Sequence, residues 1–172
     1  MPDIALEIII ADKRWQRIPK LRQHLLKTAR EIPPYLPKHL RFPCSMTLLL
    51  TNDAEMRRLN RDFRGHDKPT NVLSFPHFTP RQLTKMGKTK GRKYAGDIAL
   101  GYQYVVVESN KTNKILINHA IHLLIHGILH ILGYDHKSSA GASRMETLEK
   151  RIMSGLGLPN PYAPQPKERK AR

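Results

Sequence analysis

Hydrophobic and polar positions repeat most clearly between residues 115 and 136. At about 100° per residue, isoleucines and leucines cover most of a helix in this stretch. The histidines gather in one stripe of that helix: His119, His122, His126 and His130. Before Asp135 the stretch has no charged residue. The pattern therefore predicts a buried helix with one polar seam.

Shorter patterns predict strands and helices on both sides of this helix. Short apolar runs indicate strands, and apolar positions three or four residues apart indicate amphipathic helices. Asn52 or Asp53 is suited to cap one helix, and Ser138 or Ser139 another. The elements expected in chain order are a strand at 4–10, a helix at 15–31, a strand at 45–51, a helix from about 53 to 63, strands at 72–75 and 95–100, and helices at 102–110, within 115–136 and from about 139 to 156.

This order of elements predicts an α+β fold in a single domain. We expect a small mixed β-sheet packed with helices around the central, buried, histidine-bearing helix. The domain should span residues 1–158, followed by a basic, proline-rich disordered tail at 159–172. Residues 79–94 have two glycines and little apolar surface, so a mobile loop is expected there.

The composition adds a strong positive charge. The 172 residues are 40% hydrophobic, and 30 Lys and Arg against 14 Asp and Glu give a formal net charge of +16. This excess favours a nucleic acid as partner, because each phosphate contact releases condensed counterions. A merely solvated basic surface, or attraction to acidic lipid, is the alternative. The residues expected to contact phosphates are Lys68, Arg81, Lys85, Lys88, Lys90, Arg92 and Lys93.

Cysteine content and the N-terminal stretch favour a cytoplasmic protein. Cys44 is the sole cysteine, which excludes a disulfide framework and a four-cysteine zinc module. Asp3 and Glu7 interrupt the first apolar run, and a basic leader with a cleavage site is missing. Histidines in the middle of 115–136 disfavour a membrane span there.

Three histidines have the spacing of a catalytic metal site. His126 and His130 stand four residues apart, so their imidazoles project from adjacent helical turns. Gly133 can end the helix in a left-handed conformation and return His136 to the same point. Three nitrogen ligands leave one coordination position open, as in catalytic zinc sites. The alternative is a histidine-lined cleft without metal.

The same spacing occurs in metzincin metalloproteases, where a glutamate beside the first histidine is the general base. Here that position is Gly127. The match supports one divalent metal per chain and argues against peptide hydrolysis. Asp97, His122 and Asp135 are the residues that could act as a base or support the metal ligands.

A polar loop precedes the expected strand at 72–75. Arg64, Lys68, Thr70 and Asn71 cluster there around Gly65 and Pro69. Their side chains can bind a ligand or simply hold the turn. For Thr70 and Asn71 the structural role is at least as well supported.

Three sequence blocks resemble the YbeY family of bacterial rRNA maturation factors, in the family's order: RGHDKPTNVLSFP, AGDIALG and HGILHILGYDH. The resemblance covers about residues 4 to 158. It implies a single α+β domain and a zinc-type metal on His126, His130 and His136. It also implies a single-strand-specific endoribonuclease that acts in 16S rRNA 3′-end maturation and ribosome quality control, with Arg64 used in activity. The implied partners are rRNA, ribosomal particles and ribosomal proteins.

Two positions depart from the family pattern. His66 stands where lysine is common, and the basic stretch at 79–94 is longer than the usual connection. Two rival functions stay open: a non-catalytic ribosome assembly factor stabilised by metal, and a metal-dependent hydrolase of peptides or small molecules. The native metal, zinc or a similar ion such as nickel, is also open.

Overall fold

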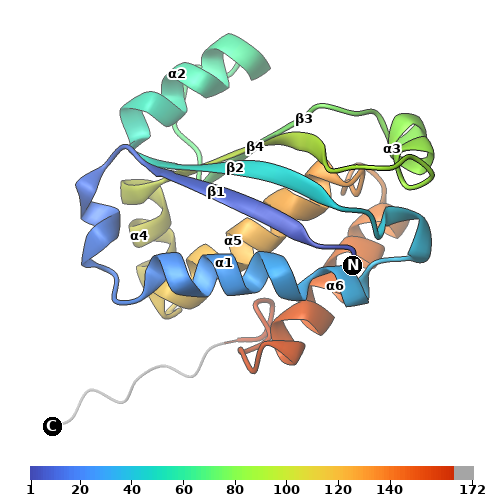
Figure 1. The fold of residues 1–172 in the computed structure, drawn as a ribbon. Coiled ribbons are helices and arrows are strands. Elements are labelled where there is room, and N and C mark those ends of the chain that lie inside the picture. Colours follow the sequence, from blue (N-terminus) through green and yellow to red (C-terminus); the bar gives the residue numbers. More distant parts are fainter. Residues whose placement is uncertain (165–172) are drawn as a thin grey trace, which may run out of the picture.

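The computed structural model describes residues 1–164 and contains a four-stranded mixed β-sheet (Figure 1). In this sheet β1, β2 and β4 run parallel, and β3 pairs antiparallel with β4 at one edge. The predicted α+β class is confirmed. In sheet order β1-β2-β4-β3, the strands are β1 (Ile4–Ile10), β2 (Cys44–Thr51), β4 (Lys93–Gly101) and β3 (Val72–Pro76).

Helices α1, α4, α5 and α6 lie on one side of the sheet, and α2 lies on the other (Figure 1). The short α3 lies at one end of the sheet. The α-helices are α1 (Leu21–Glu31), α2 (Asp53–Arg64), α3 (Pro80–Met86), α4 (Tyr102–Lys111), α5 (Leu116–Ile131) and α6 (Ser139–Gly155). Three 3₁₀ turns, η1 (Lys13–Arg17), η2 (Pro33–Tyr35) and η3 (Lys38–Leu40), complete the order.

The histidine-bearing helix α5 is the centre of the core. Its apolar residues are almost completely buried between the sheet, α1, α4 and α6. Gly127 of α5 allows a close approach, because a Cβ there would lie 2.9 Å from Ile98 Cγ2 on β4. Ser74 Oγ on β3 also donates a hydrogen bond to the Gly127 carbonyl at 3.3 Å. The edge strand β3 and its neighbour β4 therefore lie directly against the histidine helix.

The predicted helix at 15–31 is wrong in its first part. Residues 13–17 form η1, Lys20 adopts a left-handed φ of 55°, and α1 begins at Leu21. Pro19 disfavours helical geometry at Ile18. In addition, the indole of Trp15 is fully buried and donates to the Thr51 carbonyl at 2.9 Å, which fixes this turn against β2.

The predicted mobile loop at 79–94 is also wrong. It contains α3, whose start is a capping box in which Thr79 and Gln82 exchange hydrogen bonds. Leu83 is only 1% exposed, so this helix is packed on the core.

The tail expected to be disordered from 159 is folded in its first part. Residues 159–164 pack against α6, with Pro161 buried. Residues 165–172 of the predicted tail lie outside the described residues.

No single helix in residues 1–164 is long and apolar enough to cross a membrane. The α4 and α5 helices reach that length only when they are counted together, and they are bent by 115° at their junction.

Asp12 should stabilise the fold in a pH-dependent way. Hydrogen bonds from the Arg14 side chain and backbone lower the pKa of Asp12 from 3.8 to about 2. The stabilisation is therefore present above about pH 3.8 and is lost as the pH falls toward 2. We expect Asp12→Ala to lower the free energy of unfolding by about 1 kcal/mol at pH 7, and much less at about pH 2.

Urea unfolding at the two pH values tests this. Asp62→Ala is the matched control, because Asp62 pairs with Arg58 and Arg61 on the exposed side of α2, where an ion pair contributes little. An equal loss for Asp12→Ala at both pH values would contradict the assignment.

Candidate metal centre

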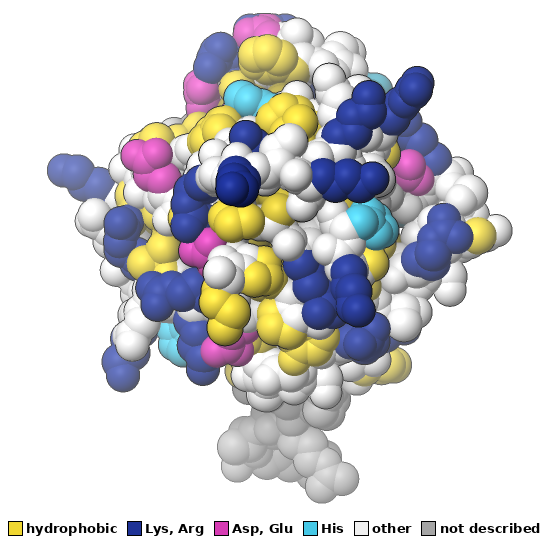
Figure 2. All heavy atoms as spheres, turned by 45° about the vertical axis from the view of Figure 1, so that its right-hand side comes forward, with side chains coloured by type: hydrophobic (Ala, Val, Ile, Leu, Met, Phe, Trp, Pro, Cys, Tyr) yellow, Lys and Arg dark blue, Asp and Glu magenta, His cyan; other side chains and the backbone are white. Residues whose placement is uncertain are grey.

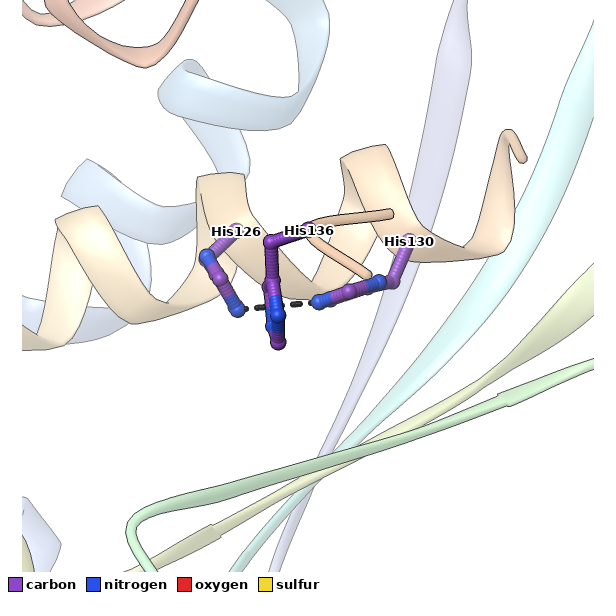
Figure 3. Close-up of side chains that lie close together, drawn as sticks. All are labelled: His126, His130 and His136. Atoms are coloured by element: carbon purple, nitrogen blue, oxygen red, sulfur yellow. Dashed lines mark hydrogen bonds between the residues drawn. The ribbon is translucent and has the colours of Figure 1, made fainter. Parts of the chain in front are cut away.

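Three imidazoles converge beside the end of α5 (Figure 3). His126 and His130 lie on successive turns, and their Nε2 atoms are 3.0 Å apart. Gly133, with φ of 93°, reverses the chain after α5 so that His136 returns from the following loop. One ring nitrogen from each histidine lies within 4.8 Å of the other two. The spacing predicted from sequence therefore does bring the three side chains together.

The protonation of His130 suits a metal ligand. Burial, together with the neighbouring His126 and His136, lowers the pKa of His130 to about 4. At neutral pH its ring is therefore uncharged and has a free lone pair, as metal coordination requires. Three imidazole nitrogens at one point are a donor set typical of zinc and related ions. The residues present thus fit a divalent transition metal.

A buried carboxylate supports His126 from behind. Glu149 of α6 is 0% exposed and accepts a hydrogen bond from His126 Nδ1 at 2.6 Å. It also accepts from His122 Nε2 at 3.3 Å and from the Tyr162 hydroxyl. Burial opposes ionisation of Glu149, but these hydrogen bonds outweigh it and lower its pKa to about 2. Glu149 is therefore a buried anion in contact with a predicted metal ligand.

The sequence prediction missed Glu149 and Tyr162. Glu149 stands among Met145, Leu148 and Ile152, which form the apolar stripe of α6. A glutamate on such a stripe is the signal that could have identified it, because an ionised side chain is seldom fully buried without a partner. Tyr162 was assigned to the disordered tail, so its contact could not be foreseen.

The triad opens into a cleft of about 550 Å³ between α5, β3 and the loop after α5. Arg64 and Asp135 line the same cleft as His126, His130 and His136. The cleft thus combines three candidate metal ligands, a guanidinium and a carboxylate.

Arg64 is the last residue of α2, held at the cleft by β3. Its guanidinium donates to the Ser74 carbonyl and lies 5.6 Å from the centre of the Phe75 ring. Gly65 ends the helix with φ of 73°, which sets the direction of this turn.

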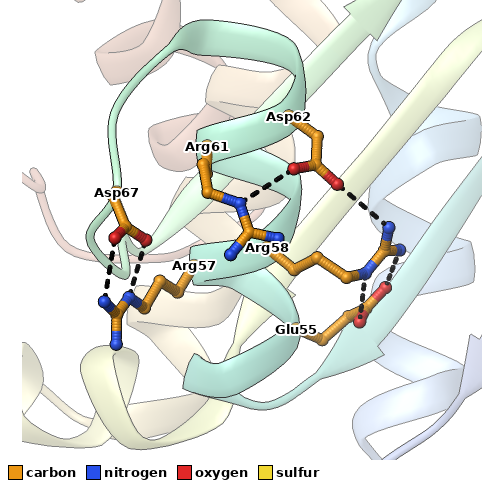
Figure 4. Close-up of polar contacts among 6 residues, drawn as sticks. All are labelled: Glu55, Arg57, Arg58, Arg61, Asp62 and Asp67. Carbon is orange, nitrogen blue, oxygen red and sulfur yellow. Dashed lines mark hydrogen bonds and ion pairs between the residues drawn. The ribbon is translucent and has the colours of Figure 1, made fainter.

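The other arginines of α2 are paired with carboxylates (Figure 4). The pairs are Arg57 with Asp67, Arg58 with Glu55 and Asp62, and Arg61 with Asp62. Among the described residues, the structure shows no carboxylate paired with Arg64. Arg64 is therefore the arginine of this helix whose charge is left for a ligand in the cleft.

Gly127, which takes the position of the metzincin glutamate, has no room for a side chain. Gly127 faces β4, where even a Cβ would be 2.9 Å from Ile98 and 3.2 Å from Ser74 Oγ. A glutamate there would point into the sheet and away from the triad. The geometry thus agrees with the sequence argument against peptide hydrolysis.

The structure separates the three residues proposed as base or support. Asp97 lies on the face of β4 opposite Ile98, with its carboxylate 3.4 Å from His77 Nε2, so it is not beside the triad. His122 is buried against Glu149. Asp135 alone lines the cleft, where its Oδ1 accepts from the Lys137 backbone N–H at 3.1 Å.

Two polar residues of the loop before β3 have structural contacts. Asn71 donates to Glu108 at 3.0 Å and accepts from the Val72 backbone at 2.7 Å, and its side chain thereby ties the loop to α4. Thr70 Oγ1 donates to Asn71 Oδ1 at 3.4 Å.

Among the charged side chains on the face shown in Figure 2, lysine and arginine are more prominent than aspartate and glutamate. Pro80, the first residue of α3, lines the cleft, so the basic residues of α3 begin at its rim. Arg92 differs from the rest, because it pairs with Asp3 at 3.0 Å and donates to the Cys44 carbonyl. The other predicted phosphate contacts are exposed or partly exposed: Lys68, Arg81, Lys85, Lys88, Lys90 and Lys93.

Comparisons with known proteins agree on one family. The family model described as Endoribonuclease YbeY matches residues 9–157. An Endoribonuclease YbeY from Rhodopseudomonas palustris (strain HaA2) is 40% identical over 94% of this chain and 83% of its own length. One from Chelativorans sp. (strain BNC1) is 46% identical over 69% of this chain and 70% of its own. A solution structure from Thermotoga maritima superposes with a TM-score of 0.56 at 23% identity, covering 97% of this chain and 99% of its own, and shares the fold.

Metal content should depend on the triad. Protein purified without chelator should carry about one divalent transition metal per chain, and His130→Ala should lose most of it while remaining folded. Elemental analysis and circular dichroism measure the two effects. His24→Ala is the matched control, because His24 lies on α1, outside the cluster. Full occupancy after replacing all three histidines would contradict the site.

Proposed function

The chain belongs to the YbeY family of endoribonucleases, and on that premise we propose that it cleaves single-stranded RNA in the cleft of the histidine triad. The observation that carries this proposal is that Arg64 and all three histidines line one cleft. An anionic phosphodiester placed there would meet both groups at once.

His126, His130 and His136 would hold the metal, and we propose zinc as the ion. Such an ion supplies Lewis-acid polarisation of a phosphoryl oxygen. His130 is kept neutral by burial and by its two neighbours, so no proton has to leave it at neutral pH.

Arg64 would stabilise the charge that develops on the phosphoryl group. Its guanidinium offers a planar fork of N–H donors that matches two phosphate oxygens. The Ser74 carbonyl and the Phe75 ring hold this fork in place before substrate binds, so little reorganisation is needed in the transition state.

RNA is a suitable substrate for a site without the metzincin glutamate. The 2′-hydroxyl of RNA can itself be the nucleophile: its oxygen bonds to phosphorus while the bond to the 5′ oxygen breaks, and the departing 5′ oxygen takes a proton from water. The site then needs an acceptor for the 2′ proton and a clamp for charge. Asp135 is the carboxylate that lines the cleft, and we assign it the role of accepting this proton. Asp97 and His122 lie elsewhere.

The natural substrate proposed is ribosomal RNA. The family resemblance supports maturation of the 16S rRNA 3′ end and ribosome quality control in the cytoplasm, with ribosomal particles and ribosomal proteins as partners. The net charge of +16 supports binding to such a polyanion.

A second candidate is a non-catalytic ribosome assembly factor. An apolar groove of about 470 Å³ on the α2 side of the sheet favours it, because Phe63 and Ile9 are 64% and 46% exposed there. Exposed apolar surface of this kind is typical of protein contacts. The mutants below separate the two functions.

Arg64→Ala should lower single-turnover cleavage of single-stranded RNA by roughly 10²-fold or more, because it removes charge stabilisation in the transition state. Metal content and RNA affinity should stay close to wild type. Arg64→Lys should recover only part of the loss, since an ammonium lacks the planar fork. Arg61→Ala is the control, because Arg61 pairs with Asp62.

Thermal melts of the same preparations exclude the alternative that Arg64 only holds the turn. In that case stability would fall first, and activity would fall with the unfolded fraction. Wild-type cleavage by Arg64→Ala would remove Arg64 from the mechanism. Cleavage that also survives loss of the triad would indicate a contaminating nuclease and favour the assembly factor.

RNA affinity should fall steeply between low and physiological salt. Replacing Arg81, Lys85 and Lys88 by glutamine should reduce the slope of log K against log salt by roughly 0.7 per lost phosphate contact. The matched control replaces Lys20, Lys27 and Arg30, which lie at the start of α1 or on it. The α1 helix packs against β1, the strand at the opposite sheet edge from β3. Equal slopes for both triple variants would show that α3 makes no specific contribution.

A further inference from the structure

We propose that Glu149 is a positioning residue for the metal ligand His126, and that Tyr162 holds Glu149 for this task. The inference rests on the metal site of the proposed function. It concerns residues of α6 and the segment after it, which do not line the cleft of the triad.

The cost of burying Glu149 argues for a specific role. Its side chain is fully buried on the apolar stripe of α6, between Leu148 and Ile152 in the helical pattern. Burying a carboxylate costs several kcal/mol unless hydrogen bonds compensate. If this position served only packing, a leucine would fill it without the free-energy cost of burying a carboxylate. The charge is therefore retained for the groups that it contacts.

The direction of the short hydrogen bond fixes the tautomer of His126. Three N–H or O–H groups surround the Glu149 carboxyl and its oxygens accept from them, so the proton of the shortest imidazole bond lies on His126 Nδ1, 2.6 Å from Glu149 Oε1. His126 Nε2 is then the unprotonated nitrogen, and it is the atom that faces His130 Nε2 at 3.0 Å. Carboxylates placed in this way orient metal-bound histidines and raise their basicity.

Two further donors hold Glu149 in place. His122 directs Nε2 to Glu149 Oε2 at 3.3 Å, and its buried Nδ1 has no hydrogen-bond partner among residues 1–164. This ring orientation leaves a buried nitrogen unsatisfied, which is unfavourable. The contact between Nε2 and Glu149 is therefore the interaction that favours the orientation. The Tyr162 hydroxyl donates to the same oxygen. Lys150 Nζ lies 5.4 Å from the centre of the Tyr162 ring.

A second glutamate–histidine pair on the same helix provides a matched control. Glu108 Oε2 lies 2.6 Å from His119 Nε2, as close as Glu149 lies to His126. His119 is outside the metal cluster and two turns before His126. Loss of Glu108 therefore removes a similar contact without touching a ligand.

The first experiment needs no metal. Nitrogen-15 NMR of the metal-free protein should show His126 as the Nδ1–H tautomer, and Glu149→Gln should abolish this preference. Glu108→Gln should leave the His126 signals unchanged. A wild-type His126 protonated on Nε2 alone would overturn the proposal, whether or not the protein binds metal.

The second experiment measures Zn²⁺ affinity by competition with a chromophoric chelator. Glu149→Gln should weaken binding by roughly 10- to 100-fold, Tyr162→Phe should weaken it less, and Glu108→Gln should not change it. Thermal melts of the metal-free variants confirm that each is folded at the assay temperature. If Glu149→Gln proves unfolded, Tyr162→Phe, which keeps the carboxylate and the ring, carries the test.

The outcomes separate this inference from the proposed function. Unchanged Zn²⁺ affinity in folded Glu149→Gln and Tyr162→Phe, with wild-type binding intact, would overturn the role of Glu149 alone. A wild-type protein that binds no Zn²⁺ would overturn the metal site itself.

Discussion

A buried helix that carries four histidines in one stripe must bring a polar partner to each ring, and the rest of the structure depends on how it does so. The structure gives the stripe two kinds of surroundings. His119 and His122 are buried and contact Glu108 and Glu149, whereas the last two histidines reach the cleft. Both glutamates come from helices packed on α5. The helices α4 and α6 therefore contact α5 through polar as well as apolar side chains.

The division along the stripe also explains where chemistry is located. In the core half of the stripe, burial lowers the pKa of His119 even though Glu108 opposes this. Toward the C-terminal end of α5, His126 and His130 line the cleft between α5, β3 and the loop after α5. The same helix therefore has a structural half, which carries His119 and His122, and a half that lines the candidate site.

Local patterns predicted the elements that depend on local interactions. The strands, α2 with its Asn52 cap, and the histidine helix followed from periodicity and capping residues, and the triad followed from spacing alone. The break before α1 followed only in part, because Pro19 disfavours helical geometry at Ile18, whereas the turn at Trp15 is fixed by a hydrogen bond to Thr51 across 36 residues. The α3 helix was missed for a different reason. Thr79 and Gln82 have the spacing of a helix capping box, but the basic, glycine-containing composition of 79–94 favoured a loop in the prediction.

Contacts between distant segments account for the remaining errors at the site. No pattern at Asp97 shows which face of β4 it occupies until the pairing with β2 and β3 is known. Glu149 was visible as a charge in an apolar stripe, yet its partners come from α5 and from the segment after α6. Periodicity can identify such an exception, but only tertiary structure shows what it contacts.

The tight contact at Gly127 also has an evolutionary consequence. The single substitution Gly127→Glu would give this chain the HExxH sequence of a metalloprotease. Judged by sequence alone, the two motifs differ at one position. This fold does not accommodate the substitution, because the new side chain would collide with β4 and could not reach the cleft. Conversion to a peptidase would first require the sheet to withdraw from α5, which would disrupt the core. The packing of one glycine thus separates two enzyme classes that share a metal-binding motif.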